Sequence, residues 1–274
     1  MDKKSKKKKG NRDKTIILIP FLLILIVILV VVFIPGGKKT TYQIKKRVDK
    51  VKTTTIVDDG FTYQTVGWLQ VQGTNIDYPI IFHEEEANYP AYLDHYVWLS
   101  NLEAKYQSHM ILYGHNIFNL SSKPQLENEN FRRFEELMSF VYYPFAKDNQ
   151  YIQLTFDGKE YVYKVFAVGF IPLSETLFFP GTYQYTKEEL MDYVDTIEKY
   201  NIYDYAVDVD KEDSIISLVT CTRFFGANQE YEFRVLGRLV RDGEKYDSYS
   251  VKKSKNYQKV EEILKGDDRN EDDI

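Results

Sequence analysis

The residue with the clearest capacity for chemistry is Cys221, the single cysteine in a chain of 274 residues. Without a second thiol no disulfide can form within the chain, so Cys221 is either a small buried apolar group or a free nucleophile. It follows residues 213–220, which are rich in β-branched side chains and contain neither Gly nor Pro, as expected of a strand. Turn-forming residues come soon after it, at 226–228. A thiol where a strand opens into a loop is well placed to attack a carbonyl carbon.

A nucleophilic thiol needs a partner that moves protons, and histidine is the usual one. Of the four histidines, His83 precedes an acidic run and is expected on an exposed turn, whereas His95 lies in an aromatic segment without clear periodicity. His109 opens a strand expected at 108–113, where a structural role is the simpler interpretation. His115 follows the end of that strand, where sheets present functional side chains. It is therefore the candidate base, with a turn-capping imidazole as the alternative.

The chemistry also needs a cation or amide donors for the negative oxygen that forms on attack. Residues 231–240 alternate as a strand does, with Glu232, Arg234 and Arg238 on one face. Since this strand follows the cysteine strand by one loop, we expect the two to pair antiparallel and to bring Arg234 within reach of the thiol. The alternative arginines are Arg223, just after the thiol, and Arg238. For Arg234 a surface charge is the simpler interpretation if the strand is considered alone.

The elements that must position these residues are mostly strands. A content of 23 Tyr and 17 Phe against 4 Met favours β-structure over a helical bundle. The pattern predicts helices at 130–140 and 186–201, the second opened by a capping box. Strands are expected at 66–71, 76–81, 108–113, 151–156, 160–171, 213–220 and 231–240. The predicted fold class is mainly β with inserted helices, most simply a closed β-barrel.

The chain divides into five expected parts. Residues 1–14 form a basic cytoplasmic tail, and 15–35 an apolar run that is long enough for a transmembrane helix. The lysines before that run place the N-terminus in the cytoplasm and the rest outside; a cleaved signal peptide is the alternative. Residues 36–60 read as an extracellular stalk, 61–241 as the catalytic domain and 242–274 as a polar C-terminal tail.

Two classes of ligand are disfavoured by composition. The formal net charge is −5, and the globular region carries no basic stripe, which argues against a nucleic-acid partner. The acidic runs at 84–86 and 267–273 read as solvated surfaces, so we expect no metal and no cofactor.

Several motifs together resemble those of one family. Residues 217–221, Ser-Leu-Val-Thr-Cys, resemble the T-L-x-T-C signature of the sortases, the cysteine transpeptidases of Gram-positive cell surfaces. Residues 112–116, Leu-Tyr-Gly-His-Asn, are similar to their histidine motif, and 233–239 to their arginine strand. Residues 66–80 and the helix at 187–201 resemble class B members. The similarity covers about residues 61–241.

The resemblance implies an eight-stranded barrel in which His115, Cys221 and Arg234 converge on a substrate groove. Cys221 would attack the Thr carbonyl of a sorting signal of Leu-Pro-x-Thr-Gly or Asn-Pro-x-Thr-x type carried by a surface protein or pilin. His115 would protonate the departing amine and deprotonate the incoming one, while Arg234 would hold the substrate backbone or the oxyanion. Thr220 would line the groove, and Asn116 would bind substrate. An amine of the peptidoglycan precursor or a pilin lysine would resolve the thioacyl intermediate.

The sequence departs from the family pattern at the arginine. Counting back from Gly237-Arg238, the usual position of the catalytic arginine falls on Glu232 or Tyr231. Either the strand is shifted or the enzyme is atypical or weakened. Two alternative functions therefore stay open: a membrane-tethered binding or scaffold domain with weak or lost catalysis, and a hydrolytic cysteine peptidase.

Overall fold

The computed structural model describes residues 40–53, 55–58, 61–82, 97–99, 108–126, 128–131, 134–175, 186–228 and 230–266. The chain from Thr41 onward forms one compact unit. The basic tail at 1–14 and the apolar run at 15–35 lie outside the described residues, as do His83 and His95. Within the described ranges, no helix is both long and apolar enough to cross a membrane.

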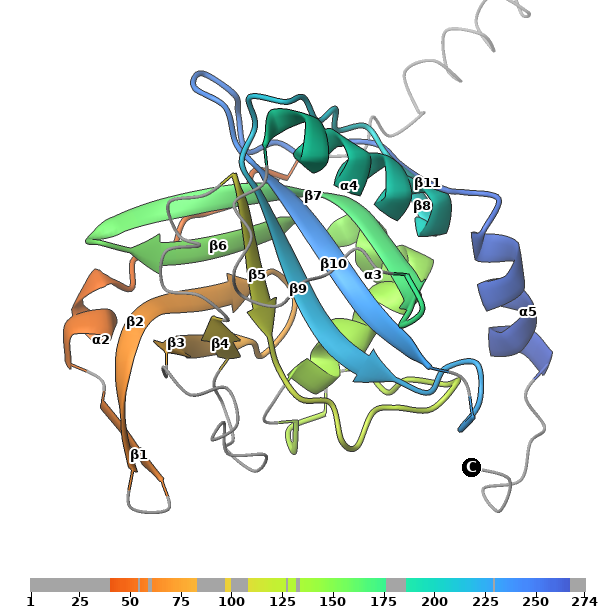
Figure 1. Cartoon of the computed structure of the whole chain (residues 1–274), viewed down its shortest axis with the longest axis horizontal. Helices are drawn as coiled ribbons and strands as arrows, with labels where there is room; N and C mark the ends of the chain where they lie inside the picture. The colour runs from red at the N-terminus through yellow and green to blue at the C-terminus, as the bar shows by residue number, and fades with distance from the viewer. Residues whose placement is uncertain are drawn as a thin grey trace, which may run out of the picture. The chain divides into compact units, whose positions relative to one another are not determined.

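A single sheet organises the described part of the chain (Figure 1). Nine strands join it in the order β1-β2-β3-β4-β5-β9-β10-β7-β6, and β6 also pairs with β2. β1 pairs with β2 at the end of this order. The other eight strands form a closed ring of pairings, as a barrel requires. The strands are β1 (Thr55–Asp58), β2 (Phe61–Val71), β3 (Asp77–Phe82), β4 (Val97–Leu99), β5 (His109–Tyr113), β6 (Tyr151–Phe156), β7 (Lys159–Pro172), β9 (Ile215–Thr222) and β10 (Tyr231–Leu239).

The turns between strands use the residues that their geometry demands. β6 and β7 are joined by Asp157 and Gly158, whose φ values of 47° and 74° are those of a type I′ hairpin turn. Between β2 and β3, Gly73 has a φ of 78°. The strands on either side of both turns, at 66–71 and 76–81 and at 151–156 and 160–171, were predicted from the sequence.

Helix α4 (Lys187–Tyr200) covers the outer face of β7, β9 and β10. It begins at the predicted capping box, in which the Thr186 hydroxyl accepts the Glu189 N–H and the Glu189 carboxylate accepts the Thr186 N–H. Its buried side chains meet apolar residues of the three strands. This second core consists of Phe166, Ala167, Ile171, Leu190, Tyr193, Val194, Ile197, Ile215 and Leu236.

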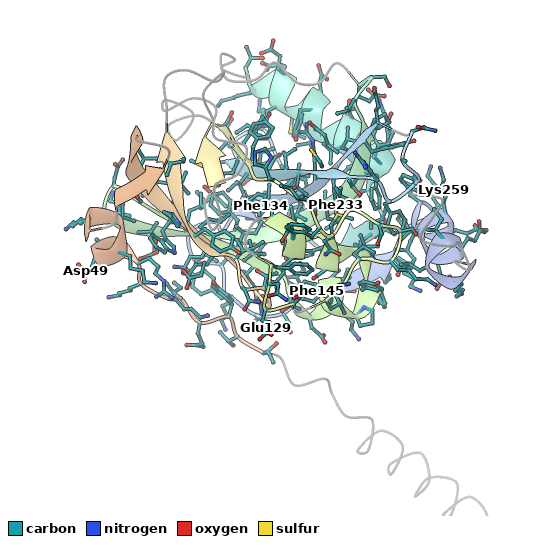
Figure 2. The ribbon with its side chains drawn as sticks, turned by 90° about the horizontal axis from the view of Figure 1, so that it is seen from below. Asp49, Glu129, Phe134, Phe145, Phe233 and Lys259 are labelled. Carbon is teal, nitrogen blue, oxygen red and sulfur yellow. The ribbon has the colours of Figure 1, made fainter. Side chains whose placement is uncertain are left out.

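The predicted helix at 130–140 is instead the 3-10 helix η3 (Phe134–Val141), followed by α3 (Tyr143–Asp148), which we did not predict. Every residue of η3 is buried, because it fills the main core inside the sheet. Figure 2 shows Phe134 and Phe233 turned toward this interior. The spacing of apolar residues predicts a helix but not its 3-10 form, and a proline near the start of α3 separates it from the next helix.

The compact unit extends beyond 61–241 at both ends. In the part we expected to be a stalk, Arg47 forms an ion pair with Asp77 at 2.6 Å and is followed by α2 (Val48–Thr53). In the expected polar tail, β11 (Val251–Lys253) pairs with β8 (Tyr203–Tyr205). Helix α5 (Tyr257–Gly266) comes next and buries two of its side chains in the main core.

Candidate active site

Cys221 lies at the end of β9, and its free thiol side chain is exposed. The preceding residues of the strand are buried, which fixes the position of the thiol at the rim of the sheet. In the antiparallel pairing of β9 with β10, Cys221 is directly opposite Glu232, and Val219 is opposite Arg234. Side chains of directly paired residues share a face of the sheet. Cys221, Glu232 and Arg234 therefore project to the same side, the one that α4 covers further along.

The segment that carries His115 runs beside the cysteine. β5 pairs with β9 in parallel, with Tyr113 level with Val219. His115 comes two residues after Tyr113, as Cys221 comes two residues after Val219, so the register brings the half-buried His115 level with the thiol. The Gly114 N–H donates to the Val219 carbonyl at 3.1 Å and continues the pairing past the strand. The structure thus brings together the two residues expected to exchange protons.

Two polar side chains tie these segments to each other. The Asn116 amide donates to the carbonyl of Cys221 at 3.1 Å, and the Thr220 hydroxyl donates to the carbonyl of Gly114 at 2.6 Å. Both side chains are buried, and Thr220 belongs to the inner face of β9, opposite to Cys221. We expected both to contact substrate in a groove. That contact stays a prediction; the hydrogen bonds show that both side chains hold the histidine segment on the cysteine strand.

The loop after His115 is positioned by Glu135, a residue that sequence reasoning missed. This fully buried carboxylate accepts the N–H groups of Ile117 and Phe118 at 3.4 and 3.2 Å. The neighbouring Phe134 N–H donates to the His115 carbonyl at 2.9 Å. Phe118 is 73% exposed, so the loop presents an aromatic ring to solvent next to the candidate base. The sequence signal for this support is the pair of adjacent acids at 135–136, inside the predicted helix at 130–140.

Arg234 is fully buried, and its guanidinium is already engaged. Nε donates to Oε2 of Glu232 at 3.1 Å, Nη2 contacts the same oxygen, and Nη1 donates to the Tyr193 hydroxyl at 3.4 Å. Burial alone would lower the pKa of Arg234, but Tyr193 and Glu232 outweigh it and raise the pKa. The arginine is therefore a permanent cation that a carboxylate neutralises on the side of the thiol.

The electrostatic surroundings of the thiol involve a different arginine. The thiol reaches solvent, but neighbouring atoms partly desolvate it, which raises the pKa of Cys221; the Glu232 carboxylate raises this pKa further. Arg223, exposed just beyond the strand, lowers the pKa of the thiol. Of the arginines considered from the sequence, Arg223 is thus the one whose charge reaches the sulfur, and it opposes Glu232.

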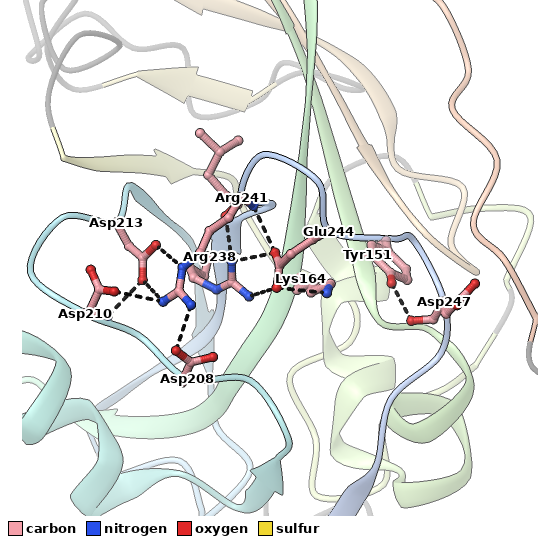
Figure 3. Close-up of polar contacts among 10 residues, drawn as sticks. Tyr151, Lys164, Asp208, Asp210, Asp213, Arg238, Arg241, Glu244 and Asp247 are labelled. Atoms are coloured by element: carbon pink, nitrogen blue, oxygen red, sulfur yellow. Dashed lines mark hydrogen bonds and ion pairs between the residues drawn. The ribbon is translucent and has the colours of Figure 1, made fainter.

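The third arginine, Arg238, lies away from this end of the sheet. It pairs with Ile215, six residues along β9 from Cys221, which corresponds to roughly 20 Å of strand. Its guanidinium donates to both oxygens of Glu244 at 2.8 and 2.9 Å, in the network drawn in Figure 3. The same carboxylate accepts the Arg241 N–H at 2.9 Å. Arg238 anchors the segment after β10 and is not brought to the thiol.

Beneath the site, a buried polar chain joins β5, β9 and α4. The Ser217 hydroxyl lies 2.8 Å from both Nε2 of His109 and the hydroxyl of Tyr193. The rings of His109 and Tyr193 lie 4.4 Å apart between centroids. Burial, aided by the charge of Arg234, lowers the pKa of His109 to about 3, so the imidazole is neutral at physiological pH. His109 has the structural role expected from the sequence; the roles of Ser217 and Tyr193 were missed.

Solved structures with the same fold are sortases of class B. Clostridium perfringens sortase B superposes with a TM-score of 0.54 at 18% identity, covering 71% of this chain and 98% of that one. A Staphylococcus aureus sortase B–substrate complex has a TM-score of 0.51 at 16% identity, and the match covers 65% of this chain and 81% of that one. Sortase B from the type II pilus of Streptococcus pneumoniae has a TM-score of 0.50 at 21% identity, and the match covers 64% of this chain and 92% of that one. At these identities the likeness is one of fold.

Comparison with curated proteins finds no match. The family model described as the Sortase domain matches residues 69–242, more than half of the chain, and the match includes His115, Cys221 and Arg234. The structure brings the first two of these residues to one rim of the sheet. The chain is therefore a member of the sortase family, with a class B-like fold.

Proposed function

We propose that this protein is a cysteine transpeptidase that cleaves a C-terminal sorting signal and transfers the preceding protein to an amine. The observation that carries the proposal is the exposed, free thiol of Cys221, held level with His115 by the Asn116 and Thr220 hydrogen bonds. A nucleophile beside a group that donates and accepts protons is the minimum that acyl transfer requires.

In this proposal the Cys221 sulfur attacks the Thr carbonyl of the sorting signal and forms a thioester. His115 supplies a proton to the departing amine, then removes one from the incoming amine. Arg223 and Arg234 are the cations at the site, the first through its influence on the thiol and the second from its buried position beside Glu232. The exposed ring of Phe118 offers an apolar contact to the peptide.

The proposal includes attachment to the cell membrane through the apolar run at 15–35, with the N-terminus in the cytoplasm and the catalytic unit outside. Support comes from the length of that run and from the lysines before it. The acceptor is an amine of the peptidoglycan precursor or of a pilin lysine. The association with a pilus is a property of the Streptococcus pneumoniae protein, and this chain shares only its fold.

Product analysis tests the proposal. Peptides of the Leu-Pro-x-Thr-Gly and Asn-Pro-x-Thr-x types are incubated with the full-length protein, with and without glycinamide. The masses of the products are then measured by mass spectrometry. A transpeptidase gives a new amide between the Thr carbonyl and glycinamide. Free Thr carboxylate in both reactions would identify a hydrolytic peptidase instead.

A second candidate function is a binding or scaffold domain that kept the fold and lost turnover. The observation in its favour is Glu232, which stands directly opposite the thiol, raises the pKa of Cys221 and engages the guanidinium of Arg234. A carboxylate at this position opposes the build-up of negative charge on a carbonyl oxygen. Tight binding of a sorting peptide with neither product would favour this candidate.

A further inference from the structure

Glu232 occupies a position from which it can bind a ligand beside the thiol. It is paired directly with Cys221, and in an antiparallel pair the β-carbons of such residues lie about 4.5–5.5 Å apart. The Glu232 side chain is 26% exposed, whereas that of Arg234 is fully buried. A molecule that approaches Cys221 from solvent therefore meets the carboxylate before it meets the guanidinium.

The Oε1 oxygen of Glu232 can accept hydrogen bonds from a ligand. Both hydrogen bonds that Arg234 donates to Glu232 end on Oε2. No hydrogen bond from the part of the chain that the structure describes ends on Oε1. A carboxylate oxygen can accept more than one hydrogen bond. In a partly desolvated site it is a strong acceptor for a charged N–H donor.

The other charges around the site restrict what this oxygen can bind. The buried Arg234 contacts Glu232 from the protein interior and also donates to the Tyr193 hydroxyl of α4. Arg223 follows β9 and is exposed to solvent. An anionic ligand would be repelled by the carboxylate that it meets first. A primary ammonium fits, because it is compact, carries three donors and can contact Oε1 without disturbing the pair on Oε2.

We propose that Glu232 binds the ammonium group of the acceptor amine and holds its nitrogen beside the thioester on Cys221. This inference rests on the proposed transpeptidase function and adds a specificity-determining residue to it. The ammonium first gives one proton to the imidazole of His115 and becomes a neutral amine. Its lone pair forms the bond to the thioester carbonyl carbon, the carbon–sulfur bond breaks, and the electron pair leaves on sulfur. The second nitrogen proton passes to the Cys221 thiolate, which restores the thiol, and His115 releases the first proton to water.

The test compares a charged with an uncharged nucleophile. The full-length protein is acylated with the sorting peptides, and resolution of the acyl-enzyme is followed at neutral pH with glycinamide, an ammonium, and with hydroxylamine, which is largely uncharged. Glu232→Gln keeps the shape and an acceptor for Arg234 but removes the charge. We expect the KM for glycinamide to rise at least tenfold and that for hydroxylamine to change less than twofold. Glu232→Asp, which retains the charge, should recover part of the glycinamide affinity. Glu230→Gln, at an exposed position just before β10, is the matched control and should resemble the wild type.

The outcomes separate this inference from the proposed function. Equal effects of Glu232→Gln on both nucleophiles, or no effect on either, would overturn the ammonium site while leaving the transpeptidase intact. If Glu232→Gln does not fold, Glu232→Asp decides, since an unchanged glycinamide KM despite the shortened side chain would count against the site. Absence of any acyl-enzyme in the wild type, read by intact mass, would overturn the proposed function and this inference with it.

Discussion

Gly114, the residue before His115, should not tolerate even one added methyl group. A β-carbon built there would lie 2.5 Å from Cγ of Phe134 and 2.8 and 2.9 Å from its two Cδ atoms. Carbon atoms in contact prefer about 3.5–4.0 Å, so the ring would have to retreat by about 1 Å. Cγ is the ring atom nearest the backbone, and rotation of the ring does not relieve the clash. Phe134 is fully buried, and its N–H holds the His115 carbonyl.

Overpacking of this kind costs about 1–3 kcal/mol, so Gly114→Ala should lower the free energy of unfolding by that amount. Phe134→Ala should lower it by about 3–5 kcal/mol, because it leaves a cavity. In the double variant the new methyl group occupies part of that cavity. The combined loss should therefore be smaller than the sum of the two single losses, by about 0.5–3 kcal/mol.

Urea unfolding of the four proteins measures these energies, and peptide turnover of folded Gly114→Ala measures the effect on the site. We expect turnover to fall even where the variant is fully folded, because the retreat of Phe134 pulls on the backbone of His115. Strict additivity of the two substitutions would refute the close packing, and normal turnover would refute its link to the histidine.

Three further predictions concern the same region. Asn116→Ala removes the amide that bonds to the Cys221 carbonyl and leaves buried backbone groups without a partner. It should cost about 1–3 kcal/mol in urea unfolding, whereas Asn130→Ala, at an exposed position, should cost little. Arg223→Gln removes the positive charge that lowers the pKa of the thiol. Alkylation of Cys221 by iodoacetamide should then require higher pH, and an unchanged pH profile would contradict the assignment of Arg223. The pKa of His109 falls from about 6.5 to about 3 on folding, so between these values the unfolded chain binds a proton that the folded chain does not. Stability should therefore decline as pH falls from about 6.5 toward 3, by up to about 1.4 kcal/mol per pH unit from this group. His109→Phe should lose that part of the decline, and the same slope in both proteins would refute the burial of a neutral imidazole.

The strands and their turns could be read from the sequence because their signals are local. Alternation in residues 231–239 separates the core side chains from Glu232 and Arg234, and Asp157-Gly158 fits only a tight hairpin. The capping box at Thr186 marks the start of α4 to the residue. The apolar spacing at 130–140 also predicts a helix, but it indicates neither the 3-10 form of η3 nor its burial on every side.

The candidate site residues could be proposed from the sequence, but their contacts could not. Cys221 and His115 stand out by type and by position at strand ends. Counting along the chain places Glu232 or Tyr231 at the usual position of the family's arginine, and the strand register puts Glu232 opposite the thiol. The engagement of Arg234 depends on side-chain reach and on competition for one carboxylate, which no spacing encodes.

The supporting contacts come from residues that are far apart in the chain. Ser217 meets His109, 108 residues earlier in the chain, only because β5 and β9 pair in parallel, and local patterns do not specify that pairing. Glu135 likewise meets the loop after His115 only once η3 is placed inside the sheet. Such polar networks follow from topology, and so they were found only in three dimensions.

The central claim is that Cys221 is the nucleophile of an acyl transfer. Intact-mass spectrometry of the full-length protein incubated with sorting peptides, without an acceptor amine, tests it most directly. We predict that the protein gains the mass of the peptide up to its Thr carbonyl, that this adduct maps to Cys221, and that Cys221→Ala gains none. An unmodified thiol together with cleaved peptide, or cleavage by Cys221→Ala at the wild-type rate, would contradict the account.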